Sequence, residues 1–162
     1  MDRRLNPSFA QLLKNPVHFL AFGFGSGLAP KGPGTAGTLV AVLIWPALAT
    51  LPLTLYLLIV ALAALLGFYL CGRTAHDLGV KDHQGIVWDE MVGYWLTMAA
   101  LPVTWVWALA GFVLFRLFDI WKPWPICWLD RHVDGGAGIM LDDLLAGVFA
   151  WLILFAVGQI WF

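Results

Sequence analysis

Charged residues are scarce in this sequence, and their scarcity excludes an ordinary soluble domain. They make up 12% of the 162 residues, about half of the roughly 25% typical of soluble proteins. Hydrophobic residues make up 61%, and the mean hydropathy is +0.83, so we expect an integral membrane protein. Nine basic and ten acidic residues nearly cancel, so the net charge does not indicate a nucleic-acid partner.

Cysteine is also scarce, since only Cys71 and Cys127 are present. The two fit no C-x-x-C metal motif and no disulfide framework, so we interpret both as unreactive thiols. No G-K-[ST] triplet follows the glycine-rich segment at 23–37, which excludes a Walker A loop. Basic residues, prolines and glycines interrupt the first 34 residues, so no cleaved signal peptide is expected.

The charged residues fall into three blocks, which leave uncharged stretches at 32–72, 91–115 and 144–162. At about 20 residues per crossing, the first stretch is long enough for two membrane helices joined by a turn at 50–54. The last stretch suits one crossing. The number of crossings therefore depends on the middle stretch.

The middle stretch is predicted to form a hairpin that turns at 101–104, where Pro102 interrupts the apolar run. A single span would place the acidic residues before and after it on opposite faces of the membrane, whereas a hairpin places them on one face. The two helices of the hairpin would be about 16 residues long, or roughly 24 Å. Helices this short need a locally thinned bilayer or protein around their ends.

We therefore predict an all-α polytopic membrane bundle that forms a single domain over residues 1–162, with an N-terminal interfacial helix at 8–22 broken at 15–16. Every Lys and Arg then lies on one side, which the positive-inside rule identifies as the cytoplasm. The five predicted crossings are 35–50, 53–71, 87–101, 104–118 and 142–161.

A similar motif occurs twice: Gly-Ile, two apolar residues and two acids, ending in Asp89–Glu90 and in Asp142–Asp143. Acids in the first turn of a helix are stabilised by the helix dipole, which is a purely structural explanation. Two copies in so apolar a chain are costly without a partner. Because carboxylate oxygens without Cys or closely spaced His select hard cations, the motifs predict a site for Mg²⁺ or Mn²⁺.

A further charged segment at 115–125 contains Arg116, Asp119 and Lys122. If a helix continues to Trp121, their spacing places Arg116 and Asp119 on one face, with Lys122 three residues further along. A salt-bridged helix end would explain the pattern structurally. The functional interpretation is a fifth carboxylate for the metal beside two cations for a phosphate, because Arg offers bidentate donors and Lys a point charge.

The glycine-rich segment at 23–37 allows backbone N–H groups to approach an anion closely. Lys31 adds a positive charge there, and Thr35 is the expected N-cap of the first membrane helix. The polar residues at 76–83 are interpreted as a solvated loop. Those at 130–134 are interpreted as shaping the return of the chain into the last helix.

These motifs, in this order and over almost the whole chain, resemble bacterial phosphatidylglycerophosphatase A, a family of membrane lipid phosphatases. The matching segments are 23–27 running into 33–35, then 86–90, 115–126 and 135–143. The resemblance implies Mg²⁺-dependent removal of the terminal phosphate from phosphatidylglycerophosphate, which gives phosphatidylglycerol. It also implies an active site at the cytoplasmic face of the bacterial inner membrane, with membrane lipid as a partner and no obligate protein partner.

The resemblance implies two sets of site residues. Catalysis and the binding of one or two Mg²⁺ would fall to Asp89, Glu90, Asp142, Asp143 and Asp119. Phosphate binding would fall to Arg116, Lys122, Lys31 and Thr35. The attacking group stays open between an activated water and an aspartate that forms a phosphoenzyme.

Two other functions are weighed against this one. An alcohol phosphotransferase acting on nucleotide-activated lipids also uses Mg²⁺ and aspartates, but its D-x-x-D-G-x-x-A-R pattern is absent. A small transporter would explain intramembrane carboxylates and a repeated motif, but the acids cluster near one face. Cysteine-based and haloacid-dehalogenase-type phosphatases are disfavoured, because the chain has no C-x5-R loop and no Asp-x-Asp motif.

Overall fold

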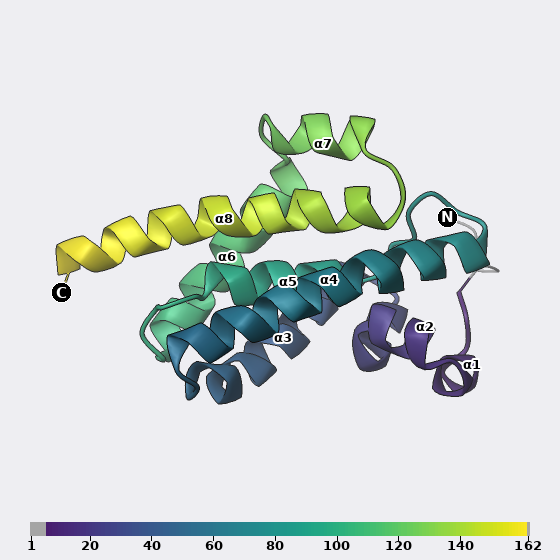
Figure 1. The fold of residues 1–162 in the computed structure, drawn as a ribbon, viewed down its shortest axis with the longest axis horizontal. Helices are drawn as coiled ribbons and strands as arrows, with labels where there is room; N and C mark the ends of the chain where they lie inside the picture. The colour runs from purple at the N-terminus through teal and green to yellow at the C-terminus, as the bar shows by residue number, and fades with distance from the viewer. Residues whose placement is uncertain (1–5, 162) are drawn as a thin grey trace.

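The computed structural model describes residues 6–161, and all of the secondary structure in that range is helical (Figure 1). The all-α prediction is therefore confirmed. The elements in order are α1 (Phe9–Lys14), α2 (Pro16–Ala21), the 3-10 helix η2 (Gly23–Leu28), α3 (Pro33–Ala49), α4 (Leu53–Leu78), α5 (Trp88–Thr97), α6 (Trp105–Trp121), α7 (Ile126–His132) and α8 (Gly135–Trp161).

The short helix α5 forms the centre of the bundle and packs against α3, α4, α6 and α8. Eight of its ten residues are buried. The indole Nε1 of Trp95 donates to the Ala41 carbonyl of α3 at 3.1 Å, and that of Trp88 donates to the Ala63 carbonyl of α4 at 3.0 Å. Because a buried indole N–H needs an acceptor, these bonds fix the rotation of α5 relative to its neighbours.

Two glycines allow α5 and α8 to cross with their backbones in contact. A Cβ added to Gly147 of α8 would lie 2.6 Å from the carbonyl oxygen of Gly93 in α5, a distance that backbone atoms do not accommodate. The hydroxyl of Thr97 in α5 also donates to the Gly147 carbonyl, at 3.3 Å. Membrane helices use small residues in this way to approach closely, and here the contact sets the register of α8 against α5.

The connections between the helices largely match the prediction. α3 ends at Ala49 and α4 begins at Leu53, so the chain turns within the predicted segment 50–54. The stretch 91–115 forms parts of two helices, and α5 ends at Thr97, four residues before the predicted end of that crossing. The left-handed backbone of Ala100 (φ 59°) follows, so the helix cannot continue into Pro102.

Two helices, α4 and α8, are long and apolar enough to cross a membrane by length and composition, against the five crossings predicted. α3 is apolar but has only 17 residues. The ten residues of α5 extend about 15 Å, half of the roughly 30 Å hydrocarbon core. α5 is therefore a buried central helix and does not resemble a lipid-exposed span.

The last helix begins at Gly135, so the prediction that it begins at 142 was wrong by about two turns. The small residues at 135–138 allow α8 to continue close beside α4. A Cβ on Gly136 would lie only 2.0 Å from the carbonyl oxygen of Phe68 in α4. The second acidic pair consequently lies inside α8 and not at its first turn, which is also contrary to the prediction.

Two predictions at the N-terminal side have opposite outcomes. The predicted break at 15–16 is confirmed, because α1 ends at Lys14 and the Asn15 side chain caps α2. Thr35 was predicted to cap the first membrane helix, and this was wrong. α3 begins at Pro33 and its cap is Gly32 in the left-handed conformation (φ 57°), because Pro fixes a backbone angle that suits the first position of a helix.

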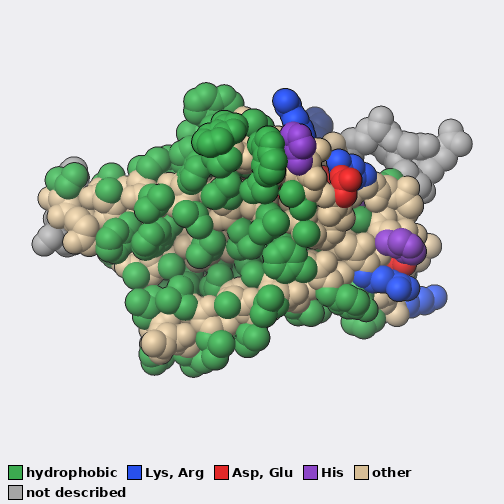
Figure 2. Space-filling model, turned by 45° about the horizontal axis from the view of Figure 1, so that its top comes forward, with side chains coloured by type: hydrophobic (Ala, Val, Ile, Leu, Met, Phe, Trp, Pro, Cys, Tyr) green, Lys and Arg blue, Asp and Glu red, His purple; other side chains and the backbone are tan. Residues whose placement is uncertain are grey.

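Hydrophobic side chains are spread over the whole face in Figure 2, whereas the Lys, Arg, Asp, Glu and His side chains gather toward one end. Some of these apolar residues are very exposed: Leu43 is 79% exposed and Leu65 is 65% exposed. An apolar surface of this extent is typical of a protein that contacts a membrane. The structure thus supports membrane association and places the charged groups together.

The contact between α5 and α8 yields a stability prediction. We expect Gly147→Ala to destabilise the protein by about 1–3 kcal/mol, because its Cβ would press on the backbone of Gly93. Gly158→Ala in the same helix is the matched control, since its Cβ would meet only the Trp107 ring, at 3.3 Å. The measurement is thermal unfolding in detergent; an equal midpoint for both variants would contradict the prediction.

Candidate functional site

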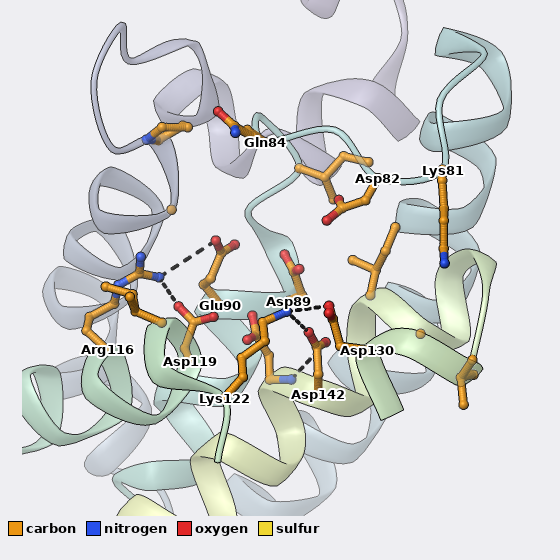
Figure 3. A pocket seen from close by; sticks show the side chains of 18 of the residues that line it. Lys81, Asp82, Gln84, Asp89, Glu90, Arg116, Asp119, Lys122, Asp130 and Asp142 are labelled. Atoms are coloured by element: carbon orange, nitrogen blue, oxygen red, sulfur yellow. Dashed lines mark hydrogen bonds and ion pairs between the residues drawn. The ribbon is translucent and has the colours of Figure 1, made fainter. Parts of the chain in front are cut away.

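A cavity of about 440 Å³ lies at the charged end of the bundle, among α5, α6, α8 and the loops beside them (Figure 3). Seven of the nine predicted site residues line it: Asp89, Glu90, Arg116, Asp119, Lys122, Asp142 and Asp143. Lys31 and Thr35 are not among the lining residues, although the neighbouring segment 32–34 is. The cavity therefore brings together both acidic motifs and the charged end of α6.

Three carboxylates converge on one point of this cavity. Asp89, Glu90 and Asp143 each offer an oxygen, and these oxygens all lie within 4.8 Å of one another. Asp89 is 8% exposed and Asp143 is 3% exposed. Oδ1 of Asp89 and Oε2 of Glu90 are buried without a hydrogen-bond partner among the described residues. Buried carboxylates this close repel one another unless a cation or protons lie between them.

Helix packing produces this acidic trio (Asp89, Glu90 and Asp143) from residues far apart in sequence. Asp89 and Glu90 lie in the first turn of α5, as predicted, where the helix dipole favours negative charge. Asp143 lies in the third turn of α8, beyond the reach of that helix's dipole. It faces α5 because its own backbone lies beside Gly93, whose added Cβ would be 2.8 Å from the Asp143 carbonyl.

Asp142, the other acid of the second motif, is not part of the acidic trio and pairs with a lysine. Nζ of Lys122 donates to Oδ2 of Asp142 at 2.5 Å and to Oδ1 of Asp130 at 2.6 Å. Burial opposes the positive charge of Lys122, but the bonds to these two carboxylates outweigh it and raise the Lys122 pKa above its ordinary value. Asp130, which had been interpreted as part of a chain return, is thus a lining residue of the cavity.

The charged end of α6 forms a second pair. Arg116 contacts Asp119, one turn later in α6, and lies 3.8 Å from Oε1 of Glu90. The helix continues to Trp121, three residues beyond the predicted end of the crossing at 118, so the condition for placing this pair on one face is met. Arg116 is 15% exposed, and its buried Nε has no acceptor among the described residues. The Nε donor of this cavity-lining residue is therefore not used by the described residues.

The glycine-rich segment contributes no charged side chain to the cavity, but one of its glycines leaves room for the charged groups of α5 and α6. Gly34 in α3 lies directly against the charged groups, because a Cβ there would be 2.1 Å from Oε1 of Glu90 and 3.1 Å from Nη1 of Arg116. The glycines of this segment were predicted to let its backbone approach an anion. The structure brings it against the Glu90–Arg116 pair, which only a residue without a side chain permits.

The acidic trio fits a hard divalent cation. All of its donors are carboxylate oxygens, the kind that Mg²⁺ and Mn²⁺ prefer, and two carboxylate oxygens of the trio have no hydrogen-bond partner within residues 6–161. Arg116 and Lys122 flank the trio from α6 and its end. The cavity thus combines a cation-binding face with donors for an anion, an arrangement suited to a phosphate group.

Comparison with known proteins identifies the family. Residues 19–158 match the family described as Phosphatidylglycerophosphatase A. The chain is 54% identical to Phosphatidylglycerophosphatase A of Escherichia coli (strain K12), covering 92% of this chain and 87% of the relative. It is 48% identical to the protein of the same name from Haemophilus influenzae, covering 96% of each.

A more distant relative carries a different name. The chain is 39% identical to a Bacteroides thetaiotaomicron protein provisionally named phosphatidylinositol-3-phosphatase, covering 91% of this chain and 93% of the relative. No solved structure matches the chain. The family match and the two relatives named alike agree with the motifs and the charged cavity, and the chain is an enzyme that belongs to the phosphatidylglycerophosphatase A family.

Proposed function

We propose that this enzyme hydrolyses the terminal phosphomonoester of phosphatidylglycerophosphate and releases phosphatidylglycerol and phosphate, as a step of glycerophospholipid synthesis. The names of the relatives from Escherichia coli and Haemophilus influenzae support this substrate. The observation that carries the proposal is the cavity in which the acidic trio lies beside Arg116 and Lys122. A phosphate monoester carries two negative charges, so its cleavage requires positive charge around the phosphoryl oxygens.

Mg²⁺ is the proposed cofactor, held by Asp89, Glu90 and Asp143. A cation in that position would act as a Lewis acid toward the phosphoryl group. The unpartnered oxygens of Asp89 and Glu90 support this assignment, because a bound cation would satisfy them. Asp119 and Asp142, also predicted as metal ligands, have basic partners in Arg116 and Lys122, so we assign them to positioning those cations.

The basic residues bind the phosphate in this proposal. Asp119 holds Arg116, which lines the cavity, and the planar fork of the guanidinium suits phosphate oxygens. Lys122 uses two of its three N–H donors on Asp130 and Asp142, which leaves one for the substrate. Lys31 and Thr35 stay candidates for longer-range contact with the anionic head group, from outside the cavity lining.

The membrane arrangement follows from the same charge distribution. We propose a multi-pass protein of the bacterial inner membrane, with five crossings and the cavity on the cytoplasmic side. In this arrangement α5 runs from the charged end into the membrane, surrounded by the other helices, and α6 returns to that end. The acyl chains of the substrate stay in the bilayer while the head group bends into the cavity.

The first test of this proposal is phosphate release. Purified enzyme with Mg²⁺ and phosphatidylglycerophosphate in micelles should release inorganic phosphate, and EDTA should stop it. Asp89→Asn should lower kcat/KM by at least about 100-fold, equivalent to about 2.7 kcal/mol, because it removes a charged ligand from the trio.

The controls for that assay are a variant and a second lipid. Asp77→Asn removes an acid that pairs with His18 and Arg73 and does not line the cavity, so it should retain wild-type turnover. Phosphatidylinositol 3-phosphate tests the substrate class suggested by the third relative's name. Faster release from that lipid, or release that EDTA does not affect, would contradict the proposal.

The second test concerns topology. Single cysteines would replace Lys81, Arg131 and Val103, in turn, in a protein whose Cys71 and Cys127 are changed to Ser. An impermeant maleimide should label positions 81 and 131 from the cytoplasmic side and position 103, in the α5–α6 turn, from the other side. If positions 81 and 131 were labelled from opposite sides, the hairpin topology would be wrong.

A further inference from the structure

Asp142 differs from its neighbour Asp143 in having both oxygens engaged. Oδ1 accepts the backbone N–H of Asp143 at 3.1 Å, and Oδ2 accepts Nζ of Lys122 at 2.5 Å. Its side chain is 8% exposed, so the charge of Asp142 is compensated almost entirely by protein. The acids of the two motifs are thus of two kinds. The acidic trio is free to bind a cation, whereas both oxygens of Asp142 already have partners in the protein.

Lys122 occupies a bridging position between two elements. Its ammonium lies between Asp130 of α7 and Asp142 of α8, at 2.6 Å and 2.5 Å, as Figure 3 shows. Its backbone is left-handed (φ 45°) where α6 ends, which turns the side chain into the cavity. An ammonium held by carboxylates from two elements performs the electrostatic task of a bridging metal ion.

The arrangement resembles a two-cation centre in which one cation is a side chain. In two-metal phosphoryl-transfer sites the ions lie close together and share neighbouring carboxylates. Here the adjacent acids Asp142 and Asp143 serve different positions: Asp143 belongs to the acidic trio, and Asp142 binds Lys122. The buried, unpartnered oxygens of Asp89 and Glu90 indicate where the remaining cation binds.

We propose that Lys122 takes the place of a second divalent cation, so that the centre holds one metal ion at the acidic trio and an ammonium at Asp130 and Asp142. This proposal rests on the metal site of the proposed function. It assigns Asp130 as a positioning residue for Lys122. The alternative is that Lys122 forms an ordinary ion pair whose removal creates no cation site.

The test counts bound Mn²⁺ per chain by electron paramagnetic resonance of the full-length protein in detergent micelles. We expect about one tight Mn²⁺ in the wild type and none in Asp143→Asn. Lys122→Met keeps most of the length of the side chain but removes its charge, and should bind about two. Adding Asp130→Asn to Lys122→Met should return the count to about one, because the new site loses a ligand.

Two further variants separate this effect from a general change of charge. Lys81→Met removes an exposed lysine that pairs with Asp134 at 2.6 Å, and its count should stay at about one. Lys122→Arg retains the positive charge and should also stay at about one. An unchanged affinity of the first Mn²⁺ in Lys122→Met would show that the variant is folded.

Two results would overturn the proposal. One is a wild-type enzyme that binds two Mn²⁺ tightly, a measurement that needs no variant. The other is Lys122→Met with an intact first site and no second one. Phosphate release is measured in the same preparations, so that the role of Lys122 and the proposed reaction are tested separately. A wild-type enzyme that binds two ions and releases phosphate would refute only the role of Lys122. A wild-type enzyme that binds one ion and releases no phosphate would refute only the proposed reaction.

Discussion

The two acidic motifs meet because α5 and α8 cross at Gly93 and Gly147, where any side chain would separate the backbones. That contact brings Asp143 beside Asp89, although the two residues lie in different helices. A larger residue at the crossing would move one set of carboxylates away from the other. The candidate metal site therefore depends on a steric condition at two glycines that contribute no ligand of their own.

Charge compensation then divides the carboxylates of the cavity into two groups. Asp119 and Asp142 have a basic partner within contact distance, Arg116 and Lys122 respectively. The acidic trio has no such partner at Asp89 Oδ1 or Glu90 Oε2 among the described residues. In an apolar bundle the unpaired group is the costly one, and its cost is what makes cation binding favourable.

Local features of the site were predictable from sequence, and long-range ones were not. The first turn of α5 at Asp89, the continuation of α6 past Asp119 and the break between α5 and α6 followed from spacing, proline and charge. The early start of α8 depends on the fit of Gly136 against Phe68 of α4. The Lys122–Asp130 bond depends on how α7 folds back. Neither contact leaves a periodic signal in the sequence.

The burial of α5 has a consequence for how the enzyme responds to its surroundings. A lipid-exposed helix adjusts its tilt when the thickness of the bilayer changes. α5 is enclosed by four helices, and its tryptophans bond to carbonyls of α3 and α4. The position of Asp89 and Glu90 is thus set by protein contacts, so we expect it to change less with the thickness of the bilayer than the position of a residue on a lipid-exposed helix would.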